Sequence, residues 1–163
     1  MKALIQAQEE GVVRFLGITG HADPAPMKEL VDRYPFDAVL MALNAADKHY
    51  NSYIEKLVPT AVEKQMGIIG MKIPARDRIF SYGGILSMKE AMSYTMSLPV
   101  STIIVGIDSI AELEENIRIA QEFEPLTAEE MLAIEEKVLP HYEHLLFYKG
   151  LSDWPEEWSG NNV

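Results

Sequence analysis

The feature that most constrains the fold is a regular alternation of short apolar runs with segments of helical spacing. The four apolar runs are residues 12–18, 36–43, 67–72 and 102–105. Strands that alternate with helices pair in parallel through right-handed crossovers. The sequence therefore predicts an α/β fold with a four-stranded parallel sheet, either a small open sheet or one half of a (β/α)8 barrel with additional C-terminal helices.

Helix starts in this chain are marked by capping residues. A Ser or Thr followed three residues later by Glu is the capping-box pattern. The pattern occurs at Ser52, Ser87, Ser109 and Thr127. Asp23 ahead of Pro24 predicts another helix start, with the carboxylate as cap and proline at the first helical position. Pro59 and Pro140 fall inside helical spacing, so each is expected to kink or divide its helix.

The sharpest functional signal is the stretch from residue 100 to residue 121. Residues 103–105 form an uninterrupted β-branched run, which predicts a buried strand covered on both faces. A turn at Gly106 and a helix that starts after Ser109 follow directly. A strand end that leads into a helix start directs several backbone N–H groups at one spot, which favours a bound phosphate. We therefore predict a phosphate seat at Gly106 and Ser109.

Composition limits the possible partners and location. The formal charge is −11, from 25 acidic and 14 basic side chains, which argues against a nucleic-acid partner. No apolar run approaches the ~20 residues of a membrane-spanning helix, so no membrane partner is expected. The chain has no cysteine, which fits a reducing, cytoplasmic location. Its 163 residues, 48% of them hydrophobic, are enough for one domain with a substantial core.

Several polar residues follow the predicted strands, at the end of the sheet where folds of this kind carry their sites. His21, Asn44 and Lys72 are the candidates for contacts with a substrate at this rim. Asp47 and His49 share the loop that begins at Asn44, but no third ligand accompanies them, and a zinc site needs at least three. We predict no metal site.

Four segments resemble, in order, the second half of the barrel of aldo/keto reductases. They are residues 11–21 (strand five), 39–47 (strand six), 66–72 (strand seven) and 101–106 with 113–116 (last strand and helix). The resemblance implies a nicotinamide-dependent carbonyl reductase on a TIM barrel, of which this chain is the C-terminal half. The implied boundaries are residues 1–150 for the half-barrel and 151–163 for a polar tail, in which Trp154 and Trp158 are candidate anchors.

The resemblance also implies NADP or NAD as the cofactor and suggests which residues contact it. Thr19 and Gly20 would lie near the nicotinamide carboxamide, and Met71 stands where many members carry a residue that stacks on the ring. The other cofactor-binding candidates, at the phosphates and the adenine, are Gly106, Ile107, Ser109, Glu115 and Asn116. Leu40 replaces a glutamine found in many members, and Glu112 stands where NADP-preferring members carry a basic residue. The choice between NADP and NAD is therefore open.

In this family the catalytic Asp, Tyr, Lys and His lie on the first four strands, and the resemblance brings no residue of this chain to a matching position. We therefore predict no catalytic residue and an inactive chain, unless another half completes the site for a small carbonyl substrate. Half a barrel exposes two sheet edges and one apolar face, so we expect a homo-oligomer. The alternative is a non-catalytic module that associates with itself or another subunit and binds a nucleotide or small anion.

Overall fold

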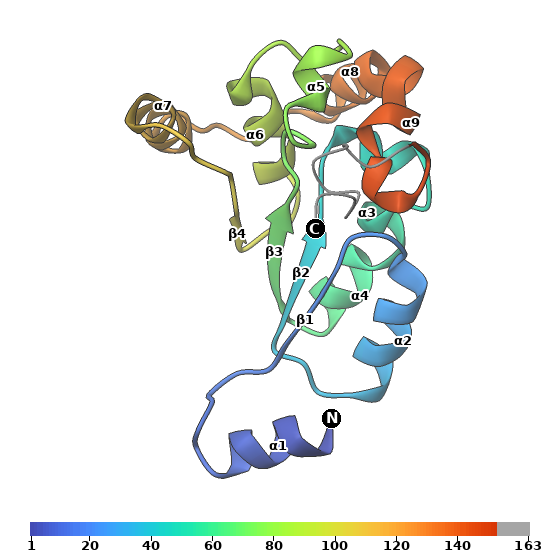
Figure 1. The fold of residues 1–163 in the computed structure, drawn as a ribbon, viewed down its shortest axis with the longest axis vertical. Helices are drawn as coiled ribbons and strands as arrows, with labels where there is room; N and C mark the ends of the chain where they lie inside the picture. Colours follow the sequence, from blue (N-terminus) through green and yellow to red (C-terminus); the bar gives the residue numbers. More distant parts are fainter. Residues whose placement is uncertain (153–163) are drawn as a thin grey trace, which may run out of the picture.

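The four predicted strands form one parallel sheet in chain order, which confirms the predicted α/β fold (Figure 1). The computed structural model describes residues 1–152, so the tail from residue 153 onward, with Trp154 and Trp158, lies outside the described residues. The strands are β1 (Gly17–Gly20), β2 (Ala38–Ala42), β3 (Gly67–Met71) and β4 (Thr102–Ile103). One row of paired residues crosses the whole sheet and consists of Thr19, Leu40, Ile69 and Thr102.

Helices follow every strand and continue beyond the last one. The α-helices are α1 (Lys2–Glu9), α2 (Pro24–Arg33), α3 (Tyr53–Lys56), α4 (Val58–Glu63), α5 (Arg78–Ser81), α6 (Met88–Met96), α7 (Ile110–Gln121), α8 (Ala128–Val138) and α9 (Tyr142–Leu145). The 3-10 helices are η1 (Ala45–His49), η2 (Leu139–His141) and η3 (Phe147–Lys149). The elements after α7 are the predicted C-terminal helices.

The predicted helix starts are confirmed. Four side chains each accept a hydrogen bond from the backbone N–H three residues further on. They belong to Ser52, Ser87, Ser109 and Thr127. Asp23 caps α2 by accepting a hydrogen bond from the backbone N–H of Ala25. The helical stretch around Pro59 is divided into α3 and α4, and α8 ends at Val138, two residues before Pro140. Local capping chemistry therefore fixes where the helices begin.

Helices cover one face of the sheet. Side chains alternate along β2 and β3, and Val39, Met41 and Ile68 are buried in a cluster with residues of α2, α3 and α4. Leu40 and Ile69 point to the opposite face and are only half-buried. A second apolar cluster fills the space among α5, α6, α8 and α9, at the end to which the strands point (Figure 1).

Two strands are shorter than the sequence predicts. The strand predicted to begin at residue 12 begins only at Gly17. The N–H groups of Val12 and Val13 instead both donate to the carbonyl of Ala7, near the end of α1. Strand β4 has only two residues, and the Ile104 side chain after it is 53% exposed. The expectation of a run buried on both faces is therefore wrong. Strand β4 lies at the edge of the sheet, and no described strand pairs with its outer side.

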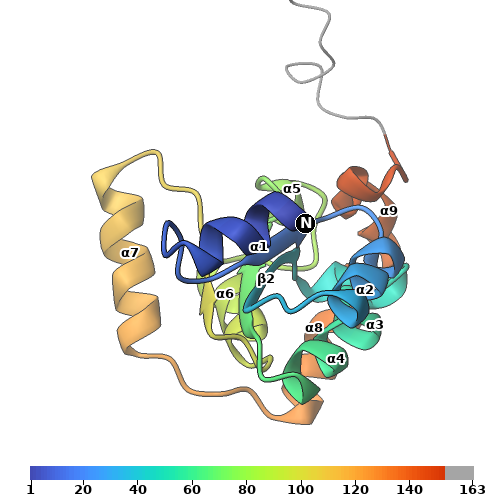
Figure 2. The ribbon, with the colours of Figure 1, turned by 90° about the horizontal axis from the view of Figure 1, so that it is seen from below.

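Helix α7 packs against α6 and stands apart from the remaining helices (Figure 2). Only Asn116 and Ile119 on this helix are buried, and three of its large apolar side chains are exposed. They are Ile110, Leu113 and Ile117. Among residues 1–152 no helix is both long enough and apolar enough to cross a bilayer.

Candidate functional site

A groove of about 1130 Å³ lies between the segment that follows β3 and the segment that follows β4. One wall begins at Met71 and Lys72 and continues into α5, and the other wall runs from Ile104 to the first turns of α7. The apolar part of the lining includes Phe80, Leu86 and Met88. The groove is therefore built at the carboxyl ends of two neighbouring parallel strands, where α/β folds hold their ligands.

The wall that follows β3 carries positive charge. Its cationic side chains are Lys72, Arg76 and Arg78. Arg78 donates a hydrogen bond to the backbone carbonyl of His144, 3.1 Å away, and its guanidinium lies 4.4 Å from the centre of the Phe147 ring. Burial and then the charge of Arg76 lower the pKa of Lys72. Asp77 lies on the same wall, so three cations face one carboxylate there, and the C-terminal helices fix part of the geometry.

The backbone of the same wall is strained. Lys72 has a φ of 61°, and Ala75, Arg76 and Asp77 have φ values of 48°, 57° and 64°. Residues other than glycine rarely adopt this left-handed conformation, which costs of order 1–3 kcal/mol each. A run of such residues persists only where the surrounding structure holds it, and such strain clusters at functional sites.

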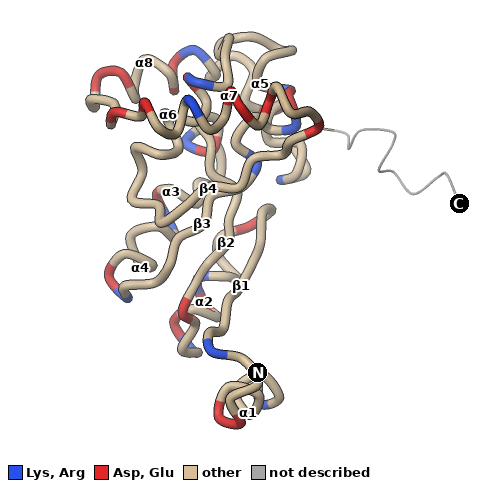
Figure 3. The backbone as a smooth tube through the Cα atoms, turned by 90° about the vertical axis from the view of Figure 1, so that its left-hand side faces the viewer, with Lys and Arg blue, Asp and Glu red and all other residues tan. Residues whose placement is uncertain are grey.

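The opposite wall of the groove is acidic and comes from the start of α7. Its carboxylates are those of Asp108, Glu112 and Glu115. Glu112 Oε2 accepts a hydrogen bond from the backbone N–H of Asp108 at 2.7 Å, and Ser109 Oγ accepts one from the backbone N–H of Glu112 at 3.2 Å. Figure 3 marks the acidic residues along α7 and α8. The start of α7 therefore already engages side chains of this chain.

Asn116 supplies an unsatisfied hydrogen-bond donor. Its side chain lines the groove and is buried, with 8% of the residue exposed, and the Nδ2 amide group has no hydrogen-bond partner within the described structure. Leaving a buried donor unpaired costs about 1–3 kcal/mol. A ligand acceptor that reached the Nδ2 group would recover this energy.

The groove brings together five of the residues that the sequence singles out. They are Met71, Lys72, Gly106, Glu115 and Asn116. A Cβ added to Gly106 would meet no atom within 4 Å, so this turn is open to a ligand. Ile107 lies instead along a smaller apolar groove between α6 and α7, and Ser109 is not part of the lining of either. Assignment of these residues to a cofactor stays a prediction.

The remaining candidates lie at the ends of β1 and β2, beside the C-terminal segment that contains η3 (Phe147–Lys149). Asn44 Nδ2 donates to the backbone carbonyl of Lys72 at 2.9 Å and to the Tyr148 hydroxyl at 3.0 Å. The His21 ring stacks on Tyr148, with 6.0 Å between the ring centres. Burial and then the charge of Lys72 lower the pKa of His21. Thr19 and Gly20 end strand β1 directly before His21. Asn44 therefore links the ends of β2 and β3 to the C-terminal segment.

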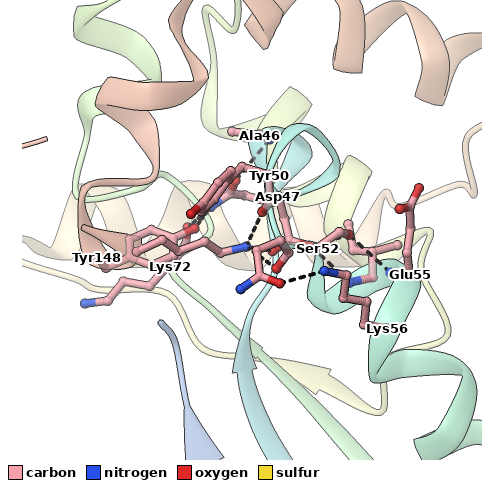
Figure 4. A network of polar contacts seen from close by, with 12 residues as sticks. Ala46, Asp47, Tyr50, Ser52, Glu55, Lys56, Lys72 and Tyr148 are labelled. Atoms are coloured by element: carbon pink, nitrogen blue, oxygen red, sulfur yellow. Dashed lines mark hydrogen bonds and ion pairs between the residues drawn. The ribbon is translucent and has the colours of Figure 1, made fainter. Parts of the chain in front are cut away.

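A buried ion pair attaches the C-terminal segment to the loop after β2, and it is the main contact that the sequence did not predict. Lys149 Nζ lies 2.5 Å from Asp47 Oδ1, and neither side chain is exposed. Lys149 also donates to the carbonyls of Tyr50 and Asn51, at 2.9 and 3.1 Å. The other Asp47 oxygen accepts hydrogen bonds from the Ser52 hydroxyl and from a backbone N–H (Figure 4). The signal in the sequence that could have indicated this buried lysine is its position directly after the apolar run 145–148.

The same contacts account for the two residues considered as metal ligands. Asp47 is held by Lys149 and Ser52, and His49 Nε2 lies 2.8 Å from the backbone carbonyl of Glu135. Within residues 1–152 no group of three or more His, Asp or Glu side chains is arranged to hold a metal ion.

Comparisons with known proteins identify the architecture. No protein-family model and no curated protein matches the sequence. Among solved structures, the holo form of aldo-keto reductase AKR11C1 from Bacillus halodurans matches with a TM-score of 0.68 and 22% identity, over 83% of this chain and 54% of that one. Its apo form gives the same score and identity. The thermostable aldo-keto reductase Tm1743, in complex with the inhibitor epalrestat, matches with a TM-score of 0.61 and 15% identity.

The chain has the fold of part of an aldo-keto reductase barrel. It spans about half the length of the solved aldo-keto reductases it matches, since it covers 53% to 55% of their chains. The predicted relation to part of this barrel is therefore confirmed at the level of the fold. The groove at the ends of β3 and β4 lies at the carboxyl rim of the partial barrel.

Proposed function

We propose that this chain is the dinucleotide-binding part of an aldo-keto reductase-like oxidoreductase and that its groove binds NADP or NAD. The observation that carries the proposal is Asn116, which lines a groove with one cationic and one acidic wall and whose amide donor is buried and unpaired. A dinucleotide offers acceptors on its base, negative charge on its diphosphate and hydroxyl donors on its riboses. Each of these groups has a counterpart in the lining.

The chemistry of the lining suggests how each part would be held. Lys72 and Arg76 supply positive charge for the diphosphate, and the open turn at Gly106 lets a ligand approach the backbone. Asn116 would donate to a nitrogen of the adenine. Thr19 and Gly20, at the end of β1, would lie toward the nicotinamide. When bound, the reduced nicotinamide supplies a hydride to a carbonyl carbon.

Reduction also needs a proton for the carbonyl oxygen, and among the described residues that line the groove the side chain able to give one is Lys72. None of the described residues that line it is a tyrosine or a histidine. The Tyr148 hydroxyl is buried and bonded to Asn44, and burial raises the pKa of its phenol. We therefore propose that this chain by itself binds the dinucleotide and turns over a small carbonyl substrate poorly or not at all, until strands of different sequence supply the catalytic residues that the resemblance places on the first half of the barrel.

The open sheet supports a proposal about assembly. Strands β1 and β4 are the two edges, and Phe15 and Ile104 beside them are 68% and 53% exposed. Since all four strands are parallel, edge β4 of one copy can pair with edge β1 of a second copy, and the reverse, to close eight strands with two-fold symmetry. We propose such a homodimer. Light scattering at micromolar concentration should give twice the mass of the chain, and a folded monomer would contradict it.

The binding experiment uses the whole chain and a matched pair of variants. Quenching of protein fluorescence by NADH and by NADPH should saturate for the wild type. Asn116→Leu removes the unpaired donor and should weaken binding about tenfold or more, a loss of about 1.4 kcal/mol, without lowering stability. Gln121→Leu, an exposed change at the end of the same helix, should leave binding unchanged.

The outcomes separate the two parts of the proposal. If neither nucleotide quenches the wild type, the proposed binding function is wrong. If binding is equal in wild type and Asn116→Leu, the groove is not the binding site. Consumption of NADH with a simple aldehyde, followed at the nicotinamide absorbance, should be at background, and turnover would contradict the proposed lack of activity.

A further inference from the structure

We propose that the acidic wall of the groove makes this site selective for NAD(H) over NADP(H). The proposal rests on the proposed function, because it concerns which dinucleotide the groove takes. The wall consists of Asp108, Glu112 and Glu115, from the start of α7. The two dinucleotides differ by one phosphate on the adenosine ribose, so the charge that faces this ribose decides between them.

The two ends of the groove determine which ribose meets the acidic wall. The reacting nicotinamide must lie toward the centre of the sheet rim, where a substrate can reach it. Met71 at the end of β3 is on that side. Helix α7 follows the edge strand β4 and packs against α6, on the opposite side of the fold from α2 (Figure 2). The adenosine half, which takes no part in the reaction, therefore extends toward α7.

A carboxylate attracts the free adenosine ribose of NAD and repels the 2′-phosphorylated ribose of NADP. It accepts hydrogen bonds from free ribose hydroxyls, which is how acidic side chains recognise NAD in dinucleotide-binding folds of another class. A 2′-phosphate has no such donors at neutral pH and would place its negative charge beside Glu112 and Glu115. The resulting repulsion acts in a groove where solvent screens it only partly.

The helix start compensates for this repulsion only in part. The N-terminus of a helix can bind a phosphate through its free backbone N–H groups. At the start of α7, however, the N–H of Asp108, just before the helix, donates to the Glu112 carboxylate, and the N–H of Glu112 donates to the Ser109 hydroxyl. The chain's own carboxylate thus occupies part of the position that an anion would take.

Positive charge in the groove lies on the other side. Among the described residues, the cations that line it are Lys72, Arg76 and Arg78, all on the wall that follows β3. These residues serve the diphosphate, which NAD and NADP share, and so they do not distinguish the two. Asn116 likewise contacts a part common to both. The acidic wall is the only described part of the lining that faces the group by which they differ.

The test compares the affinities of NADH and NADPH for the full chain by calorimetry at low salt. The wild type should bind NADH about tenfold more tightly than NADPH or better. The double variant Glu112→Gln, Glu115→Gln removes the two charges and keeps the side-chain shapes, and the amide oxygen introduced at position 112 can still accept from the Asp108 N–H. It should bind NADPH about tenfold more tightly than the wild type does, with little change for NADH.

Two controls identify the cause as local charge. Glu114 lies on the same helix but outside the groove lining. The variant Glu114→Gln should therefore leave the affinities for NADH and NADPH unchanged. Added salt should reduce the difference between NADH and NADPH in the wild type, because it screens exposed charges. A difference that persists in the double variant would contradict the assigned cause.

The failures of the two proposals can be told apart. Equal or tighter binding of NADPH by the wild type overturns the selectivity and leaves the proposed dinucleotide site standing. If neither nucleotide binds, the proposed function is wrong and the selectivity falls with it.

Discussion

Replacing Lys149 by methionine tests whether the buried ion pair holds the C-terminal segment on the sheet. The side chain of methionine is similar in length and fills the same space without charge. The Asp47 carboxylate would then keep its hydrogen bonds from Ser52 and from the Ile54 N–H but would lose its counter-charge in a site without solvent exposure. The carbonyls of Tyr50 and Asn51 would lose a donor as well.

The expected cost is large compared with the stability of a domain of this size. Removing one partner of a buried ion pair costs about 3–5 kcal/mol, because the remaining charge is uncompensated. Whole domains are stable by only about 5–15 kcal/mol. We expect Lys149→Met to lose about 4 kcal/mol. With a urea dependence of about 2 kcal/mol per molar, the unfolding midpoint should fall by about 2 M.

Urea unfolding followed by circular dichroism measures this loss against two reference variants. Lys56→Met removes an exposed lysine of the same network, whose Nζ lies 2.7 Å from Asn51 Oδ1, and should cost less than about 1 kcal/mol. Adding Asp47→Asn to Lys149→Met removes the unpaired charge and should restore at least about 1 kcal/mol. The reasoning is refuted if Lys149→Met is no more damaging than Lys56→Met, or if the double variant is less stable than the single one.

Two further predictions concern the backbone and the rim. Gly84→Ala should lower the free energy of unfolding by about 2–4 kcal/mol in urea titrations, since Gly84 has a φ of 99° and an added Cβ would lie 2.5 Å from the Lys137 carbonyl oxygen; a loss below about 1 kcal/mol would contradict this reading. Burial holds the pKa of His21 below its ordinary value of 6.5. The unfolded chain therefore takes up this proton first, and stability should fall as the pH drops below about 6.5. His21→Phe should remove that part of the loss, and urea midpoints that change equally with pH in both proteins would contradict it.

The order and direction of the elements could be predicted because the signals for them are local. The caps at Ser52, Ser87, Ser109 and Thr127 each involve a residue and the backbone N–H three positions on. A contact of this kind depends on nothing else in the fold. The alternation of helices and strands then leaves parallel pairing as the favoured topology.

The exposure of the strands and the fastening of the C-terminal segment could not be predicted, because both depend on distant neighbours. An apolar run such as residues 103–105 is buried on both faces only if another strand and a covering layer lie beside it, and β4 is an edge. Asp47 and Lys149 are 102 positions apart. Asp47 could be read only as a loop residue near His49 until the fold brought the lysine against it.

The lining of the groove comes from strand β3, helices α5, α6 and α7 and the loops between them, and it includes Met71, Gly106, Glu115 and Asn116. This convergence follows from parallel pairing, which brings the carboxyl ends of β3 and β4 to the same edge.

The proposed site divides into two halves that depend on different parts of the sheet. The nicotinamide end would involve Thr19, in the row that crosses the sheet on the face that α2, α3 and α4 leave uncovered, where Leu40 and Ile69 are only half-buried. Closure of the barrel would add atoms to that face. The adenosine end is built by α7 and the segment after β3, which are already in place. Dinucleotide affinity and selectivity should therefore be measurable on this chain alone, whereas turnover depends on strands of different sequence that carry the catalytic residues.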